Sequence, residues 1–467
     1  MKFSVVSSVS GVEKDACTVR LVAPSEVERF VEADGVCFLE IPFDVAKVAR
    51  RRSVLLFRRI VSLAKKYHLE NLILAWDEVY FSSLSISVAD YAEMVGVAME
   101  MAHYEFRRFR TVPKEGWKDV KNVSVVVSDS SVVRAVRFGL GRSKQIALWV
   151  NRCRDFANTP GADMTPRSFV STVSKLVKNT SIRMTVLDEK KISQLKMGGV
   201  LGVSKGSVEP PRFLILEYSG GKKTDAPIVL VGKGVTFDTG GIDVKPYPYA
   251  LDMNMDMSGG AAVVSTLFVA HDLKVKKNIV VLVPLVENMM SGSAFRPGDI
   301  LTAMDGTTME VRNTDAEGRL ILADALCYAR RWKPQLVIDV ATLTGAALGA
   351  LGERASAVFT QDDLLAQKMF DCGESSGDYV WRLPLWEEHG ADIKGVFGDI
   401  ANLRTVGSDR YAGASSAAAF LHHFAKDFSL WVHVDMAPRM TSVHDEFLAK
   451  GAAGAPVRLL LRLLETI

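Results

Sequence analysis

Short runs of apolar residues alternate with stretches of helical periodicity along the chain. Residues 228–231 and 336–340 are continuous apolar runs, which are typical of strands that are buried on both faces. Helical patterns at 166–178, 258–272 and 317–332 lie between such runs. This alternation predicts an α/β architecture, in which helices cover a central sheet.

The length of 467 residues favours two or three domains. Further strands are expected near residues 18–24, 35–41, 71–76, 122–127, 184–187, 213–218, 278–283 and 430–434. Further helices are expected at 44–67, 88–109 and 143–156, and the last of these ends at the breaker cluster Asn158-Thr159-Pro160-Gly161. We therefore predict a smaller three-layer α/β domain over 1–142, a linker helix over 143–160 and a larger α/β domain over 161–467.

Composition narrows the class of protein. The chain is 48% hydrophobic and 24% charged, which excludes a disordered or collagen-like protein. Its five cysteines are odd in number and widely separated, a pattern typical of free thiols in a reducing compartment. No segment approaches the roughly 18 apolar residues that span a membrane, and the first residues make a poor secretory signal. We expect a cytoplasmic protein without a membrane partner.

Positive charge is concentrated in the first third of the chain. Residues 1–160 hold 24 Lys and Arg against 19 Asp and Glu, whereas the whole chain has a net charge of only +3. Much of this excess lies in residues 50–66, and such a run is usually a solvated helix face. Contact with nucleic acid is the alternative, although no nucleic-acid-binding motif accompanies the run.

Carboxylates follow the expected strands and precede the expected helices of the larger domain. Asp238 lies in a glycine-rich segment after residues 228–231, and Asp256 stands just before a helix of small residues. Asp315 and Glu317 lie just before the helix 317–332 and, in an extended segment, would point to the same side. Open α/β sheets bind ligands at the carboxyl ends of their strands. Because crowded carboxylates repel one another, the cluster predicts a site for hard divalent cations.

Three cationic side chains accompany these carboxylates. Lys233 and Lys245 flank Asp238, and Arg319 follows Glu317. A lysine near two cations can lose its proton and act as a ligand, because its pKa shifts readily on burial. A second, charged lysine could stabilise an oxyanion, and the arginine could hold an anion in the same pocket.

The segment Asn313-Thr314-Asp315-Ala316-Glu317-Gly318-Arg319-Leu320 resembles the signature of the leucyl aminopeptidase family, the two-metal cytosol aminopeptidases of peptidase family M17. The resemblance extends through residues 232–245, 287–289, 296–299 and 339–346 and covers most of 150–467. It implies a metallo-aminopeptidase domain with a mixed central sheet, and an amino-terminal domain similar to macro domains.

The same resemblance implies a role for each site residue. Metal ligands are expected at Lys233, Asp238, Asp256, Asp315 and Glu317, and catalytic roles are expected for Lys245 and Arg319. The implied cofactors are two divalent ions per subunit, with Zn or Mn favoured and Mg or Co possible, and bicarbonate at Arg319 as a proton shuttle. Substrate-binding residues are expected at Met253, Asn313, Thr342, Leu343, Gly345 and Ala437. Of these, Met253, Thr342, Gly345 and Ala437 would line an apolar pocket for Leu-like or Met-like side chains.

These expectations amount to a homohexameric enzyme that releases amino-terminal residues from peptides with a free amino terminus. The alternative is a regulatory protein that binds nucleic acid or a nucleotide through its basic amino-terminal domain. The chain departs from the family pattern at Thr239 and at the stiff, aromatic Pro246-Tyr247-Pro248-Tyr249 segment. A serine hydrolase is disfavoured because Pro210 and Pro211 follow Gly202-Val203-Ser204-Lys205-Gly206, where a nucleophile elbow requires a helix.

Overall fold

The computed structural model describes residues 1–467 apart from 9–11, 13–14, 34 and 409–410. Contacts divide the chain into two compact units. The first comprises Met1–Asn151 with Ser442–Lys450, and the second comprises Arg152–Thr441 with Gly451–Ile467. Each unit contains a sheet and helices, as the predicted two-part α/β fold requires. Whether residues 1–142 and 161–467 are domains joined by a linker stays a prediction.

The first unit is built on a six-stranded sheet with the order β1-β6-β5-β2-β4-β3. Its strands are β1 (Lys2–Val6), β2 (Cys17–Val22), β3 (Arg29–Ala33), β4 (Val36–Pro42), β5 (Asn71–Ala75) and β6 (Asn122–Val126). All neighbours are parallel except β3 and β4. The helices that accompany this sheet are α1 (Arg50–Lys66), α3 (Val88–His103) and α4 (Val133–Asn158). Buried side chains of β2, β4, α1 and α3 share one hydrophobic core.

Helix α4 begins ten residues before the helix expected at residue 143. Two glycines, Gly139 and Gly141, lowered the helical propensity of this segment. The structure shows why the first is tolerated: a Cβ atom on Gly139 would lie 2.1 Å from the Ala89 carbonyl oxygen. Close packing of α4 against α3 therefore overrides the local preference.

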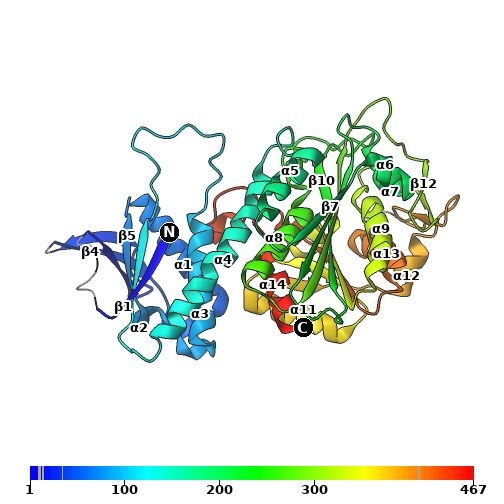
Figure 1. Cartoon of the computed structure of the whole chain (residues 1–467). Helices are drawn as coiled ribbons and strands as arrows, with labels where there is room; N and C mark the ends of the chain where they lie inside the picture. Colours follow the sequence, from blue (N-terminus) through cyan, green and yellow to red (C-terminus); the bar gives the residue numbers. More distant parts are fainter. Residues whose placement is uncertain (9–11, 13–14, 34, 409–410) are drawn as a thin grey trace. The chain divides into compact units, whose positions relative to one another are not determined.

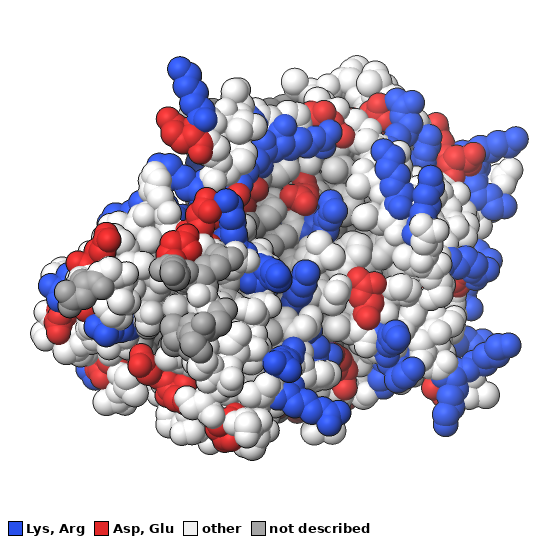
Figure 2. Space-filling view, turned by 60° about the vertical axis from the view of Figure 1, so that its left-hand side comes forward, with Lys and Arg blue, Asp and Glu red and all other residues white. Residues whose placement is uncertain are grey.

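The basic run of α1 is only partly a solvated face. Arg51, Arg52 and Lys66 are exposed as expected. Three others form ion pairs within the unit: Arg58 with Glu446, Arg59 with Glu28, and Lys65 with Glu105. On the face drawn in Figure 2, acidic and basic side chains are interspersed. Three basic side chains of α1 thus form ion pairs with carboxylates of the same unit.

The second unit contains a mixed nine-stranded sheet with the order β16-β15-β18-β14-β9-β11-β8-β7, and β10 pairs with β11. Its strands are β7 (Arg183–Leu187), β8 (Arg212–Ser219), β9 (Ile228–Gly232), β10 (Gly234–Asp238), β11 (Asn278–Asn288), β14 (Leu336–Ala341), β15 (Ser356–Phe359), β16 (Val380–Arg382) and β18 (Trp431–Asp435). The central strands β9, β11 and β14 are parallel and fully buried along most of their length. Short strands β12 (Ile300–Thr302), β13 (Thr308–Glu310) and β17 (Ile400–Ala401) form a separate small sheet.

Helices cover both faces of the large sheet (Figure 1). Helix α8 (Ser258–Asp272) packs with α14 (Val457–Thr466), and α14 packs with α11 (Asp363–Ser376). Helix α9 (Gly318–Ala329) packs with α7 (Gly198–Ser204) and α13 (Gly413–Ala425). Helix α9 is buried at every residue and α8 at all but its last two, so both helices fix the positions of the residues at their amino-terminal ends. Among the described residues, no helix is long and apolar enough to cross a membrane.

The glycine-rich segment before Asp238 is a strand and not the loop expected from the sequence. After β9 the chain kinks at Lys233, whose N–H donates to the Val340 carbonyl and whose carbonyl accepts from Gly260 N–H. Residues 234–238 then pair with β11 as β10, with an irregular register before Asp238. The strand ends at Asp238, which therefore projects from the carboxyl edge of the sheet.

Candidate active site

Four carboxylates come together at the carboxyl end of β10 and just before α8 and α9. One oxygen from each of Asp238, Asp315 and Glu317 lies within 4.8 Å of the others. Asp256 joins this group through Lys233, whose Nζ lies 2.8 Å from an oxygen of Asp256 and 2.8 Å from one of Glu317. Apart from Asp315, which is half-exposed, these carboxylates are buried. The structure thus brings the five predicted metal ligands into one cluster.

The segment that carries Asp315 and Glu317 is not extended, contrary to the expectation from their spacing. Glu317 has helical backbone angles, with φ of −78° and ψ of −33°, and directly precedes α9. The two carboxylates come together because the chain turns between them, with the Ala316 N–H donating to the Asn313 carbonyl. Asp315 is held in this turn because its N–H donates to the side-chain oxygen of Asn313 at 2.6 Å.

Two lysines supply positive charge inside the cluster. Lys233 is 3% exposed and donates to the Thr342 carbonyl at 3.0 Å. Burial opposes its charge, but attraction to Asp256 and Glu317 outweighs burial and raises the pKa of Lys233. Lys245 Nζ lies 2.8 Å from Asp238 and also pairs with Asp315. Its pKa is raised in the same way, because nearby carboxylates overcome the effect of burial.

Two of the carboxylates, Asp315 and Asp256, have raised pKa values. Burial, together with repulsion from Asp238 and Glu317, raises the pKa of Asp315 to about 7. Burial also raises the pKa of Asp256 well above its ordinary value; Lys233 opposes this rise and Glu317 adds to it. Crowded, desolvated carboxylates of this kind are stabilised by bound cations.

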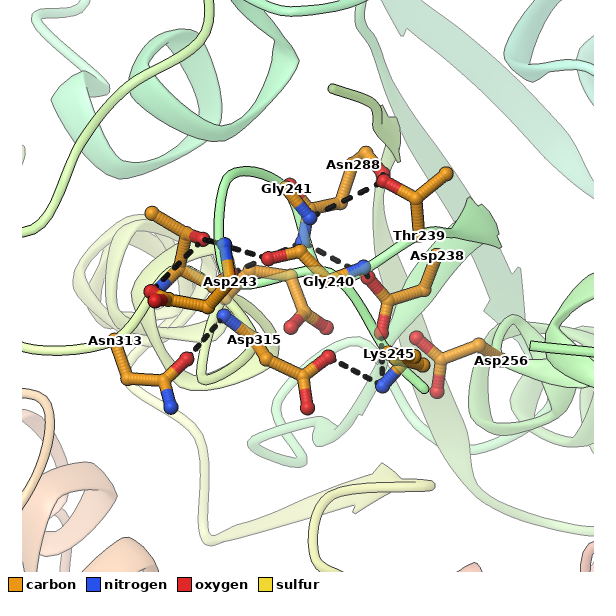
Figure 3. Close-up of polar contacts among 12 residues, drawn as sticks. Asp238, Thr239, Gly240, Gly241, Asp243, Lys245, Asp256, Asn288, Asn313 and Asp315 are labelled. Atoms are coloured by element: carbon orange, nitrogen blue, oxygen red, sulfur yellow. Dashed lines mark hydrogen bonds and ion pairs between the residues drawn. The ribbon is translucent and has the colours of Figure 1, made fainter. Parts of the chain in front are cut away.

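A hydrogen-bond network fixes Asp238 and the turn that faces it (Figure 3). Asp238 Oδ1 accepts from Asn288 Nδ2 and from Gly240 N–H, each at 2.8 Å. Asn288 Nδ2 also donates to the Thr314 carbonyl at 3.0 Å, and Asp243 accepts from Thr314 N–H at 2.8 Å. Sequence reasoning assigned no role to Asn288 and Asp243, whose contribution depends on contacts between distant segments.

Two glycines make room for this arrangement. Gly318, at the start of α9, passes against the Lys233 side chain, so an added Cβ would lie 2.7 Å from Lys233 Cε. Gly240 has φ of +89°, and its Cβ would meet the Asp243 carbonyl at 2.4 Å. Any larger residue at either position would displace a member of the cluster.

Arg319 lies fully buried beside the carboxylates. Its Nη1 donates to the Asn402 carbonyl at 2.6 Å, whereas its Nε is buried without a hydrogen-bond partner among the described residues. Burial lowers the pKa of Arg319 to about 10, which leaves the side chain charged at neutral pH. The unpaired Nε therefore favours an acceptor or an anion at this position.

The cluster lies in an open cavity of about 650 Å³. Its wall contains these predicted site residues: Lys233, Asp238, Lys245, Met253, Asp256, Asn313, Asp315, Arg319, Thr342, Leu343, Gly345 and Ala437. Glu317 contacts this wall through Lys233. Further apolar wall residues that the sequence did not single out are Leu348, Leu403 and Met440. One cavity thus combines a charged cluster with an apolar wall.

Asp435, at the end of β18, connects two parts of that apolar wall. Its Oδ1 accepts from Leu343 N–H and from Ala437 N–H, each at 3.1 Å. Its Oδ2 accepts from the Thr344 hydroxyl at 2.6 Å. Asp435 is fully buried, and its hydrogen bonds hold together two pocket segments, at Leu343 and Ala437, that are 94 residues apart in the sequence. No sequence motif marked this residue.

The hydrogen bonding of the carboxylate oxygens indicates that the cluster can hold cations. One oxygen each of Asp256, Asp315 and Glu317 is buried and accepts no hydrogen bond of good geometry, although a lysine ammonium group lies nearby. A buried acceptor without a hydrogen bond lowers the stability of the folded state unless a cation or a donor contacts it. Hard carboxylate oxygens with one amine suit divalent ions such as Zn, Mn, Mg or Co.

The sequence model of the cytosol aminopeptidase family's catalytic domain matches residues 151–461. The chain belongs to the cytosol aminopeptidase family. It is therefore a hydrolase with aminopeptidase activity from a metal-dependent family, as the sequence motifs predicted. Ser204, which the sequence already disfavoured as a nucleophile, ends α7 instead of preceding a helix, and its hydroxyl donates to the Leu201 carbonyl.

Curated members of the cytosol aminopeptidase family are similar over most of their length. A probable cytosol aminopeptidase of Methylobacillus flagellatus is 41% identical over 390 residues, covering 83% of this chain and 77% of the relative. One from Burkholderia mallei is 42% identical over 392 residues, covering 83% and 76%. Among solved structures, the bottromycin maturation enzyme BotP has a TM-score of 0.83 and 28% identity, covering 96% of this chain and 98% of BotP. BotP in complex with Mn gives the same TM-score with 29% identity, covering 97% and 98%.

Proposed function

We propose that this cytosol aminopeptidase uses two divalent ions to release amino-terminal residues from peptides, with a preference for Leu-like and Met-like side chains. The observation that carries the proposal is the convergence of four carboxylates and two lysines on one wall of a cavity whose other wall is apolar. The proposed ligands are Lys233, Asp238, Asp256, Asp315 and Glu317. The complex of BotP with Mn is consistent with this choice of cation.

Two divalent ions held there would supply Lewis-acid activation of a water molecule and a binding point for the free α-amine of the peptide. Lys245 is the proposed oxyanion donor, because neighbouring carboxylates keep its ammonium group charged and its Nζ faces the cavity. Lys233 is the more deeply buried of the two lysines and contacts Asp256 and Glu317, so it is the proposed ligand, which requires that its amine lose its proton when ions bind.

Arg319 is the proposed site of a bicarbonate ion that moves the proton. Its buried Nε has no described partner, while Nη1 is tied to Asn402 and holds the guanidinium in place. A planar anion can accept from such a fixed guanidinium edge.

Apolar residues of the wall define the proposed side-chain pocket. Met253 and Met440 contribute flexible thioether side chains, and Gly345 and Ala437 leave room between them. An extended apolar side chain that contacts these residues would be desolvated at a smaller cost than a polar or charged one.

Metal analysis of the purified protein, paired with hydrolysis of a panel of amino-acid amides, tests the proposal. We expect two divalent ions per chain, loss of activity on chelation and its return with Mn or Zn. Leucyl and methionyl amides should be cleaved at least ~10-fold faster than aspartyl or glycyl amides, on the scale of filling an apolar pocket. One ion per chain at full activity, or activity that survives chelation, would refute the two-ion site.

The cytoplasm is the proposed location, as the names of the curated relatives suggest. A homohexamer is proposed from the family resemblance. The nucleic-acid-binding alternative receives no support from the comparisons, and ion pairs within the first unit engage three of the basic side chains on which it rested.

A further inference from the structure

The segment between Lys245 and Met253 presents apolar side chains to solvent beside the active-site cavity. Tyr247 is 85% exposed, Tyr249 is 69% exposed and Leu251 is 65% exposed. Just before them, Ile242 is 42% exposed and Val244 is 49% exposed. Five large apolar residues within ten positions make a concentrated patch, and such patches usually mark binding surfaces.

This segment is tied to the catalytic machinery at both ends. It starts at Lys245, the proposed oxyanion donor, and ends at Met253 in the side-chain pocket. Between these points Tyr249 N–H donates to the Pro246 carbonyl at 2.9 Å, and Leu251 N–H donates to the Pro248 carbonyl at 3.0 Å. Successive turns with two prolines limit the conformations of the segment. The segment therefore loses little conformational entropy when a ligand binds to it.

Tyr249 and Pro246 line the cavity, and the exposure of Tyr249 places it at the mouth. The carboxylates and Lys233 are buried, which places the reaction centre at the inner end. A peptide whose free amine is held at the inner end must leave through the mouth. Its residues after the cleaved bond therefore pass Tyr249, while the released residue does not.

We propose that the Pro246–Leu251 segment, called the aromatic rim below, selects peptides whose second residue has an aromatic or large apolar side chain. Tyr249 provides the principal contact, through stacking of its ring against that side chain. Tyr247 and Leu251 extend the apolar surface beyond it. This inference rests on the proposed aminopeptidase function and adds the substrate class that the site favours.

The test compares leucyl-phenylalanine with leucyl-glycine in the metal-loaded, full-length protein. We expect kcat/KM to be about tenfold higher for leucyl-phenylalanine, mainly through KM, as for one added apolar contact. Tyr249→Ala should reduce this ratio to near one, and Tyr249→Phe should retain it because the ring remains. Phe397→Ala is the matched control: Phe397 is 83% exposed and lies outside the cavity wall, so the ratio should not change.

Hydrolysis of leucyl amide, which has no second side chain, tests the proposed aminopeptidase function independently of the aromatic rim. If the wild type does not cleave leucyl amide, the proposed function itself fails. If it cleaves leucyl amide but shows equal kcat/KM for both dipeptides, or if Tyr249→Ala lowers both equally, the aromatic rim does not select substrate. A Tyr249→Ala protein of altered mass by light scattering would assign the rim to subunit contact and overturn the inference.

Discussion

Glu317 links the two halves of the charged cluster. It is 1% exposed, directly precedes α9 and contacts Lys233, which in turn contacts Asp256. An oxygen of Glu317 also lies within 4.8 Å of oxygens from Asp238 and Asp315. A single carboxylate with neighbours on both sides is well placed to bridge two ions.

Replacement of Glu317 by alanine should therefore remove activity and metal together. We expect leucyl-amide hydrolysis to fall at least ~100-fold and bound metal to drop below two ions per chain, since a bridging ligand is lost. Glu189→Ala is a matched control, because Glu189 is an exposed carboxylate at the start of a surface helix, α6 (Glu189–Gln194). Unchanged turnover with two ions still bound would contradict the site assignment.

The two lysines should separate into distinct phenotypes. Lys245→Ala should keep both ions and lower kcat by ~100-fold or more, on the scale of one lost oxyanion donor. Lys233→Ala should lose metal, because Lys233 is the more deeply buried lysine and lies between the proposed ligands Asp256 and Glu317. Bound metal and kcat are measured on the same preparations of both variants. Loss of metal in Lys245→Ala and its retention in Lys233→Ala would exchange the two proposed roles.

At the scale of elements, the sequence predicted the central strands of both units and several long helices, but it missed strand β15 and helices α11, α13 and α14. Strands β9, β14 and β18 and helices α5 (Pro166–Val177) and α8 lie within two residues of their expected bounds. The kink at Lys233 was missed, because the bonds that form it come from Val340 and Gly260. Local propensity carries no information about such distant partners.

The same reasoning separates the site residues that were predicted from those that were missed. The ligand candidates stand in short motifs beside strand ends, so the sequence alone indicated them. Asn402 was missed, although its side chain donates to the Asn313 carbonyl at 2.7 Å and accepts from Arg312 N–H at 2.7 Å. It follows β17, a strand of two residues that has no sequence pattern.

Asp324 in α9 connects three elements of the second unit, and its contribution to stability should depend on pH. Its carboxylate accepts from Val200 N–H at 2.9 Å and Met304 N–H at 2.8 Å, and so connects α9 to α7 and to the segment after β12. Burial outweighs these donors and raises the pKa of Asp324 to about 7. The folded state therefore retains a proton that the unfolded state releases near pH 4.

Because the folded-state pKa is the higher one, the stabilisation by Asp324 is complete below about pH 4 and is lost as pH rises through about 7. Between pH 5 and 8 the wild type should lose about 2 kcal/mol more of its unfolding free energy than Asp324→Asn, which does not titrate. Urea unfolding at both pH values measures the difference. Parallel pH dependences in the two proteins would show that Asp324 is ionised in the folded state.

At the scale of the whole molecule, the first unit is completed by residues from near the carboxyl end. Glu446, in the Ser442–Lys450 segment, pairs with Arg58 of α1 at 3.4 Å, and both side chains are buried. Its main-chain carbonyl also lies 3.5 Å from Arg58 Nη1. This segment is therefore part of the structure of the first unit.

Glu446→Ala should destabilise the first unit by about 3 kcal/mol, because a buried arginine loses its carboxylate partner. The predicted signature is faster amide hydrogen exchange in α1 than in α9. The double variant Arg58→Met with Glu446→Leu should recover most of the loss, since apolar residues can replace a buried ion pair. Exchange that rises equally in both helices would show that the pair does not stabilise the first unit specifically.

The discontinuity of the first unit also sets an order of events during synthesis. Residues 1–151 are synthesised long before Ser442–Lys450, so the Glu446 carboxylate is not yet available to Arg58 when α1 has been made. The contacts between these two segments can form only after most of the second unit has been translated. The first unit can therefore be completed only after the segments that carry the active-site residues have been synthesised.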